Sequence, residues 1–164
     1  MPVTVATAGK VIDLGDGAYI EVLHPQAKAL KDTQDDLNNN ALVLRVVYGS
    51  VSFLLTGDIE AEGEDAILDA GYDVSATVLK VAHHGSDGST TRPFLDAVDP
   101  ALAVVSSGEG NPFGHPSPGL RLRLAPVPLL RTDLNGTVSF KTDGSSLWLT
   151  VERGEVDIEA VGVR

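Results

Sequence analysis

The sequence predicts an α/β protein in which a mixed sheet carries helices on one face. Three observations indicate this class: residues 11–56 alternate like paired β-strands with glycine turns, strand-like and helix-like segments alternate up to residue 106, and β-like segments return after residue 128. The chain shows no internal repeat and no linker. Residues 1–164 are therefore expected to form a single domain with its own core.

The N-terminal part predicts two β-hairpins and a polar loop. The four strands are expected at 11–14, 19–23, 41–48 and 51–56, with turns at Gly15-Asp16-Gly17 and Gly49-Ser50. Residues 28–40 are polar and predict a surface loop, with a short helical turn at 27–31.

The remaining segments predict strands that alternate with helices and then a return to β-structure. A helix is expected at 59–70, closed by Gly71, and a second one opens at 89–93 and ends at Val98. Residues 119–124 predict a third, short helix. Strands are expected at 74–82, 102–106, 129–132, 136–142 and 147–151, with an edge strand in the tail at 155–163.

The charge and the residue content limit the classes of function that this chain can have. The formal net charge is -11 and the isoelectric point is about 4.6, so the chain repels phosphate backbones unless cations or a local basic patch intervene. This argues against a simple nucleic-acid-binding module, but it is compatible with a metal-dependent phosphodiesterase. The absence of cysteine excludes disulfides, thiolate zinc sites and cysteine nucleophiles. Residues 1–10 do not resemble a signal peptide, and no apolar run approaches the roughly 20 residues that span a bilayer.

The most informative segment is 78–86, where an apolar strand ends in His83, His84, Gly85 and Ser86. Neutral imidazole is the commonest protein metal ligand. Adjacent residues at a strand end point to opposite faces, so at most one of these imidazoles is expected to bind a metal directly. The alternative is a buried, hydrogen-bonded histidine pair. Ser86 is not in a Gly-x-Ser-x-Gly elbow, so it is expected to hold a phosphate or orient a histidine.

Two further loops hold candidate residues. Asp58 follows an apolar strand and Gly57, where a carboxylate can bridge two cations or, alternatively, cap the helix that begins at 59. His115 lies between a glycine and a proline, where it could protonate a leaving oxygen or bind phosphate, or be an ordinary surface histidine. His24 is expected to be structural. Asn40 and its two preceding asparagines are typical turn formers, although an amide near a metal site could orient ligands.

The ordered set of these loops resembles the metallo-β-lactamase-like domain of the bacterial competence protein family ComEC/Rec2. The matching motifs are Asn39-Asn40-Ala41-Leu42-Val43-Leu44, Leu54-Leu55-Thr56-Gly57-Asp58, Leu79-Lys80-Val81-Ala82-His83-His84-Gly85-Ser86 and Asn111-Pro112-Phe113-Gly114-His115-Pro116. The resemblance is collinear from about Gly9 to about Leu149. It favours Asp58 as a metal ligand over Asp58 as a helix cap.

The resemblance implies a four-layer αββα sandwich with one or two metals, commonly zinc or manganese. It implies a soluble domain on the extracytoplasmic face of a membrane channel protein for single-stranded DNA, where it degrades the strand that is not imported. Asp58 would be the bridging ligand, and the His83–His84 pair would supply a histidine ligand, with His84 preferred. His115 would act at the phosphate, and Ser86 and Asn40 would contact substrate.

The sequence also departs from this family. The superfamily loop His-x-His-x-Asp-His does not occur among the four histidines, so we expect the chain to correspond to the C-terminal half of such a domain. Ser117 stands where the family often has a second histidine. A catalytic zinc needs about three protein ligands, and we therefore expect weak or no metal binding and no activity of this chain alone. Half of a sandwich would leave sheet surface uncovered, so we expect either self-association or cover of that surface by the long loops.

A local cationic patch for DNA is expected near Lys80, Arg92, Arg121 and Arg123. Two alternatives to a nuclease stay open. One is a hydrolase of the same fold that acts on a lactone, thioester or phosphocholine ester, and the other is a non-catalytic module for interaction or channel gating.

Overall fold

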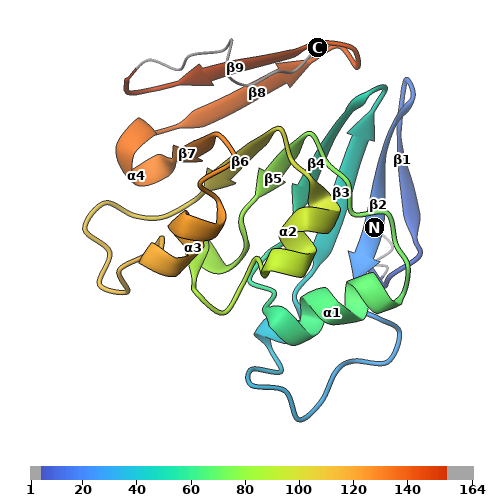
Figure 1. Cartoon of the computed structure of the whole chain (residues 1–164). Helices are drawn as coiled ribbons and strands as arrows, with labels where there is room; N and C mark the ends of the chain where they lie inside the picture. The colour runs from blue at the N-terminus through green and yellow to red at the C-terminus, as the bar shows by residue number, and fades with distance from the viewer. Residues whose placement is uncertain (1–4, 155–164) are drawn as a thin grey trace.

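The computed structural model describes residues 5–154 and contains a seven-stranded mixed sheet whose strands lie in sequence order (Figure 1). The strands are β1 (Val11–Gly15), β2 (Ala18–His24), β3 (Val43–Tyr48), β4 (Val51–Leu55), β5 (Val78–Lys80), β6 (Leu102–Val105) and β7 (Leu129–Arg131). β1 to β4 pair antiparallel, and β4 to β7 pair parallel. The predicted mixed sheet is therefore confirmed.

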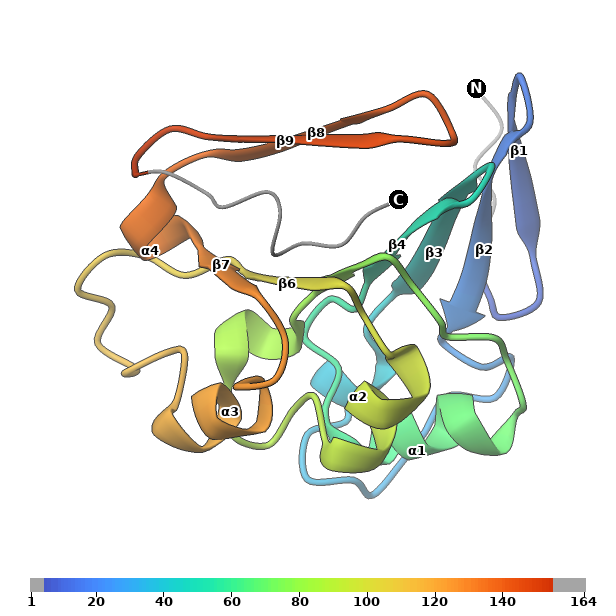
Figure 2. The same ribbon diagram turned by 45° about the horizontal axis from the view of Figure 1, so that its top comes forward.

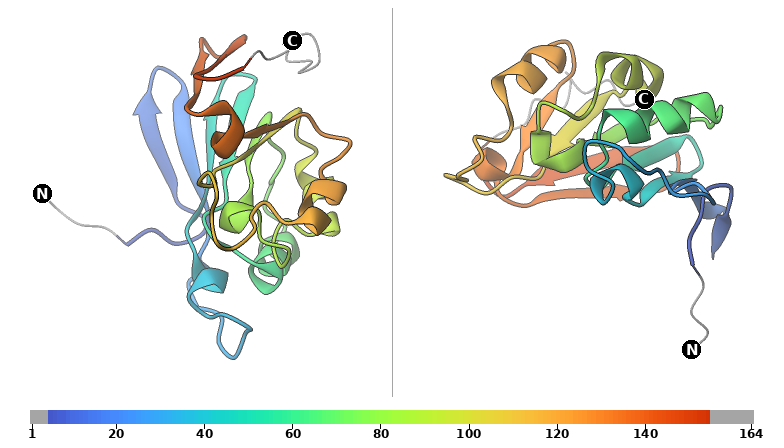
Figure 3. Two further views of the ribbon diagram at one scale, coloured as in Figure 1. Left: turned by 90° about the vertical axis from the view of Figure 1, so that its left-hand side faces the viewer. Right: turned by 90° about the horizontal axis from the view of Figure 1, so that it is seen from below.

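Three helices connect the parallel strands and lie on one face of the sheet, as predicted (Figure 2). They are α1 (Ala61–Asp69), α2 (Arg92–Val98) and α3 (Pro118–Arg123). Parallel neighbours require a crossover, and crossovers of one hand place successive helices on the same side. The view from below shows the three helices as one layer beside the strands (Figure 3, right).

The other face of the sheet is partly covered by a separate hairpin. It consists of β8 (Val138–Thr142) and β9 (Leu147–Val151), which follow the short helix α4 (Thr132–Asn135). Phe140 packs edge-on against Phe53 of β4 at 5.5 Å between ring centroids. At the far end of the hairpin, the Gly144 carbonyl accepts a hydrogen bond from the Ser50 amide at 2.7 Å. The hairpin thus spans the sheet from β7 to the β3–β4 turn.

Two apolar clusters hold these layers together. The larger lies between the sheet and the helices and includes Leu54, Leu79, Ile67 and Phe94, all fully buried. The smaller lies under the hairpin around Leu102, Leu130 and Leu149. Burial of Val, Leu and Ala side chains carries most of the packing, as expected for a chain with few aromatic residues.

Several boundaries differ from the prediction because distant contacts decide them. α1 begins at Ala61 and not at residue 59, since the side chain of Asn39 accepts a hydrogen bond from the Gly63 amide in the first turn. β5 covers only three residues of the predicted 74–82. Val74 and Ala76 are buried, but the Ala76 amide bonds the carbonyl of Val98 and not a strand.

One further local prediction is wrong, and one element was missed. The helical turn of the polar loop is at Asn38–Asn40 and not at 27–31, because the Asp35 carboxylate accepts the amides of Leu37 and Asn38. The short helix α4 was not predicted and occupies the residues after β7. The predicted strand at 155–163 lies outside the described residues. No helix in the described part of the chain is long and apolar enough to cross a membrane.

Candidate functional site

The candidate residues gather where β4, β5 and β6 end. These strands are parallel, so their carboxyl ends share one edge of the sheet. Asp58 follows β4, the histidine pair follows β5 and Ser106 follows β6. The His83 amide donates to the Gly57 carbonyl at 3.0 Å, which joins the first two loops directly. The sheet thereby brings together residues that lie far apart in the sequence.

The histidine pair follows the end of β5 in a tight left-handed turn. His83 (φ 45°), His84 (φ 53°) and Gly85 (φ 88°) all have positive φ, which is uncommon for non-glycine residues. Strand alternation therefore does not orient these imidazoles, because β5 ends at Lys80. Strained backbone of this kind clusters at functional sites.

Glycine at position 85 is required for a close approach. A Cβ atom there would lie 2.6 Å from Cβ and 2.9 Å from Cα of Pro116. The turn that carries the histidine pair therefore packs directly against the loop that carries His115. The rings of His83 and His115 have their centroids 6.1 Å apart.

Asp58 and His84 face each other across the loops. Oδ1 of Asp58 lies 3.7 Å from Nε2 of His84, and both side chains are about half exposed. Nδ1 of His84 donates to the Ser106 carbonyl at 2.8 Å, so that Nε2 is the nitrogen available to a ligand. Asp58 does not cap α1, whose N-cap position is Glu60. The structure thus leaves its carboxylate free to meet the imidazole.

Glu60 is a site residue that the sequence reasoning missed. Its Oε1 lies 3.0 Å from Nδ1 of His83, and Nδ2 of Asn38 lies 3.5 Å from the same oxygen. This carboxylate lies two residues after Asp58, within the segment where the sequence predicted a helix at 59–70. Nothing local distinguishes it, because its partner is in another loop.

His115 is held by its own loop. The side-chain amide of Asn111 makes two bonds to the backbone of His115. Its Nδ2 donates to the His115 carbonyl at 2.7 Å, and its Oδ1 accepts from the His115 backbone N–H at 3.0 Å. Burial lowers the pKa of His115, and the neighbouring His83 and His84 lower it further. Its imidazole is therefore neutral at pH 7, which suits a group that accepts or passes on a proton.

The residues expected to contact substrate have structural partners. The side chain of Asn40 accepts a hydrogen bond from the Leu30 backbone N–H and donates to the Leu30 and Asp36 carbonyls. It therefore holds the two ends of the polar loop together. Ser86 is half-buried, and its amide donates to the His83 carbonyl at 2.9 Å. Ser117 caps α3, because its hydroxyl accepts the Leu120 amide at 3.1 Å.

The expected cationic patch is not assembled. Arg92 and Arg123 line one hollow on the helical face, but they are paired with Asp96 at 2.8 Å and with Asp87 at 3.2 Å respectively. Lys80 lies elsewhere, and its ammonium donates to the Val81 carbonyl. Burial lowers the pKa of Lys80, and the nearby Asp58 opposes that shift. Carboxylates thus offset much of the positive charge on the described surface.

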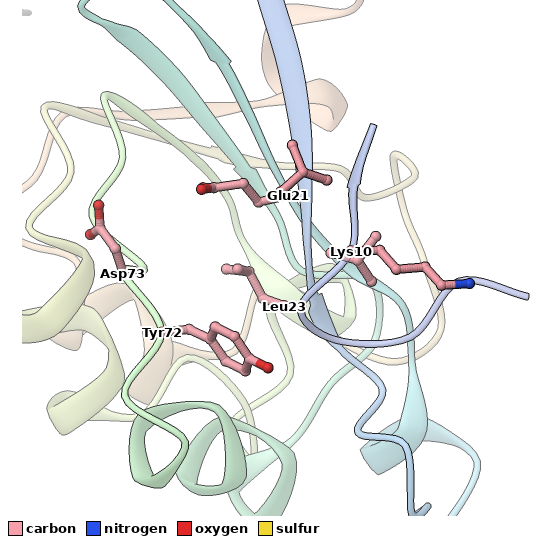
Figure 4. Close-up of a pocket in the computed structure, with 8 residues that line it drawn as sticks. Lys10, Glu21, Leu23, Tyr72 and Asp73 are labelled. Atoms are coloured by element: carbon pink, nitrogen blue, oxygen red, sulfur yellow. The ribbon is translucent and has the colours of Figure 1, made fainter. Parts of the chain in front are cut away.

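A cavity of about 220 Å³ adjoins the candidate site. It is lined by His84, Ser107, Gly108, Asn111, Phe113 and His115. A second hollow of about 150 Å³ lies beside β2 and the end of α1, where Lys10, Glu21, Tyr72 and Asp73 surround it (Figure 4). Glu21 and Asp73 are already paired with Arg45 there. The first cavity is therefore the one that opens on the candidate chemistry.

The Asp58–His84 pair fits part of a metal site. Two atoms that each lie about 2.1 Å from one zinc ion are at most about 4.2 Å apart, and the observed 3.7 Å is within that limit. A backbone carbonyl on the remote nitrogen is the usual support for a ligating histidine. Within residues 5–154, however, no group of three His, Asp or Glu side chains could hold a metal ion. The residues present supply two donors.

The fold and this edge define an α/β protein with a carboxylate–imidazole pair on loops at the carboxyl ends of parallel strands. No protein-family model matches the chain. It is 37% identical over 135 residues to ComE operon protein 3 of Bacillus subtilis (strain 168), which covers 81% of this chain and 17% of that protein. It is 40% identical over 128 residues to competence protein ComA of Neisseria gonorrhoeae, with 76% and 18% covered.

A further relative is recombination protein 2 of Haemophilus influenzae, which is 36% identical over 108 residues, or 66% of this chain and 13% of that protein. The chain belongs to the ComEC/Rec2 family of competence proteins. It spans less than a fifth of the length of these relatives.

Proposed function

We propose that this chain is part of a divalent-metal-dependent phosphodiesterase that cuts single-stranded DNA during DNA uptake. The observation that carries the proposal is the 3.7 Å approach of Asp58 to His84, with the remote nitrogen of His84 held by a backbone carbonyl. Membership of the competence family supports DNA as the substrate. The chain would form half of a metallo-β-lactamase-like sandwich, and further ligands would come from other sequence of a longer protein.

The side chains divide the work in this proposal. Asp58 and His84 would hold manganese or zinc, which when bound lowers the pKa of water and neutralises phosphate charge. His83 is the alternative histidine ligand, although its Nδ1 is engaged by Glu60. His115, neutral and held by Asn111, would bind the phosphate or protonate the leaving oxygen. Ser86 lies next to this turn and is the remaining candidate for a phosphate contact.

The same proposal accounts for the acidic chain. The protein chain has a net charge of -11, so DNA approaches it only where cations compensate the repulsion. The metal would provide that compensation. The partners in this picture are single-stranded DNA and the rest of a membrane channel protein, with the site on the extracytoplasmic face.

The rival proposal is a non-catalytic module for interaction or channel gating. This proposal is supported by the number of metal donors, because Asp58 and His84 are the two that meet among residues 5–154. A hydrolase of another ester or lactone would use the same pair, so only substrate tests distinguish it from a nuclease.

Titration of the isotopically labelled 164-residue chain with Mn²⁺ tests the metal pair by paramagnetic broadening of nuclear resonances. We expect weak binding, with broadening concentrated at Asp58, His84 and their neighbours. Asp58→Asn should abolish that local effect, while Asp69→Asn, an exposed position on α1, should leave it unchanged. Broadening spread over the acidic surface and absent at this pair contradicts the proposal. Tight stoichiometric binding in isothermal titration contradicts the expectation of an incomplete site.

The activity itself is tested in a full-length protein that contains this sequence and is as long as the relatives. Mn²⁺-dependent cleavage of a labelled single strand should be lost in Asp58→Asn and kept in Asp69→Asn. Local metal binding without cleavage of DNA, in a folded protein, favours the non-catalytic module. Cleavage of ester or lactone substrates alone favours the third alternative.

A further inference from the structure

The loop between β6 and α3 exposes an aromatic side chain next to the candidate site. Phe113 is 78% exposed, an unusual state for a large apolar ring. It lines the 220 Å³ cavity together with His84 and His115. The cavity is smaller than the roughly 300–1,000 Å³ of pockets for drug-sized ligands. Its size suits a single planar ring system.

The ring of Phe113 is parallel to an imidazole. The centroids of Phe113 and His115 are 5.9 Å apart, and the ring planes differ by 15°. Parallel, offset rings of this kind leave a flat apolar face that accepts another aromatic ring. His115 itself contacts the His83–His84 turn, so the flat face is continuous with the proposed cutting site.

The loop is braced, so the ring is presented in a defined place. Asn111 bonds the Gly108 carbonyl as well as both backbone groups of His115. The Gly114 amide donates to the Asn111 carbonyl across the turn that carries Phe113. A braced aromatic loses little conformational entropy when it binds a partner.

The cavity also differs in charge from the rest of the surface. The chain carries 23 acidic residues, yet none of the residues that line this cavity is a carboxylate. Its polar groups are imidazole, amide and hydroxyl. The nearest carboxylates lie behind this lining, where Asp58 is 3.7 Å from His84 and Asp133 accepts a hydrogen bond from the Ser107 hydroxyl.

We propose that Phe113, stacked beside His115, is a platform for one unpaired nucleobase of the DNA strand that lies in the candidate site. This inference rests on the proposed function and deepens it. Stacking is independent of base identity, because every base has an aromatic face. A base in a duplex is already stacked, so the platform selects single strands and sets the position of the phosphate next to His84 and His115.

The test uses the full 164-residue chain with Trp148→Phe, which removes the only tryptophan. In that background, Phe113→Trp places a reporter on the platform, and Leu122→Trp places a matched reporter at a 77% exposed position on α3. Fluorescence is measured on addition of a single-stranded thymidine oligonucleotide, an abasic strand of equal length and a duplex. The buffer contains Mg²⁺ to screen the acidic chain. Anisotropy of a label on the strand reports binding separately.

We expect the single strand to quench Phe113→Trp, and the abasic strand, the duplex and the Leu122→Trp reporter to show little quenching. Phe113→Ala should weaken binding of the single strand by about 5- to 150-fold, whereas Phe113→Tyr should stay within about twofold. Binding without quenching, and unaffected by Phe113→Ala, overturns the platform but leaves the proposed nuclease standing. No binding of any strand also overturns the platform, whereas DNA as substrate is decided by cleavage in the longer protein.

Discussion

Oε1 of Glu60 lies 3.0 Å from Nδ1 of His83, and this contact ties the start of α1 to the turn that follows β5. Carboxylate oxygen can only accept, so Nδ1 of His83 carries the proton when Glu60 is ionised. The neighbouring His84 likewise donates from Nδ1, to the Ser106 carbonyl. Both adjacent imidazoles therefore keep Nε2 as the open nitrogen, although their backbone lies in a left-handed turn.

We predict that Glu60→Ala shifts the tautomer of His83. In the unaltered chain the nitrogen shifts of neutral His83 should report a proton on Nδ1, measured by long-range nitrogen–proton NMR. Without the carboxylate acceptor, the proton should populate Nε2 as well. Asp69→Ala on the same helix serves as the control and should change nothing. An unchanged tautomer in Glu60→Ala means that the contact does not orient the ring.

We predict a large loss of stability for Glu64→Ala. Glu64 is fully buried, and its carboxylate accepts the backbone amides of Thr90 and Thr91 at the start of α2. Removing it leaves both amides without a partner, at a cost of about 2–5 kcal/mol in the free energy of unfolding by urea titration. Glu64→Gln keeps an acceptor and should lose less. Asp65→Ala, exposed on α1, should stay within about 0.5 kcal/mol.

Glu64 also gives stability a pH dependence of defined sign. Burial raises the pKa of Glu64 above its ordinary value of 4.5, so above that pH the folded state holds the proton more tightly than the unfolded chain. Its contribution to stability is greatest below pH 4.5 and falls as pH rises through the raised pKa. The difference in unfolding free energy between the unaltered chain and Glu64→Gln, followed against pH, should decline over that range. A flat difference contradicts the raised pKa.

His24 should act with the opposite sign. It is fully buried beside the Asn39 carbonyl, and burial lowers its pKa below 6.5. The unfolded chain therefore binds protons first as pH falls, and the stability that His24 contributes is full above pH 6.5 and lost below it. His24→Gln should flatten the acid side of the curve of unfolding free energy against pH. The same curve is measured for His115→Gln as a comparison, because the pKa of His115 is also lowered by burial.

The outer edge of β1 predicts self-association. All five residues of β1 are exposed, and Val11, Ile12 and Leu14 present apolar side chains on a strand whose outer edge has no partner strand among residues 5–154. Sedimentation should show association that grows with concentration, and Leu14→Lys should reduce it because charge on an edge strand opposes pairing. Leu37→Lys makes the same change at an exposed loop position and should not. A clean monomer at every concentration contradicts the prediction.

Elements whose signals are local could be predicted. The β1–β2 and β3–β4 hairpins follow from glycine turns between alternating strands. α2 follows from Pro93 in its first turn, and Thr91 is its N-cap. The order of the loop motifs also led to the competence family, which the curated relatives confirm. These inferences succeed because turn and cap chemistry acts within a few residues.

Features that depend on distant contacts could not be predicted. The start of α1 is set by Asn39, which lies 24 positions before the amide it accepts. Glu60 joined the candidate site through a histidine 23 positions away. The left-handed turn at His83 and His84, where strand alternation does not apply, could not be read from the local sequence. The cationic patch failed in part because Asp96 pairs with Arg92 and Asp87 pairs with Arg123.

The sequence by itself determined which residue types stand at the ends of the parallel strands and, through their order, the family. Only the tertiary structure decided which of those side chains meet. The reason is physical: local backbone preferences are written in neighbouring residues, whereas the approach of Asp58 to His84 depends on the parallel pairing of β4, β5 and β6. That pairing brings separate loops to one edge of the sheet.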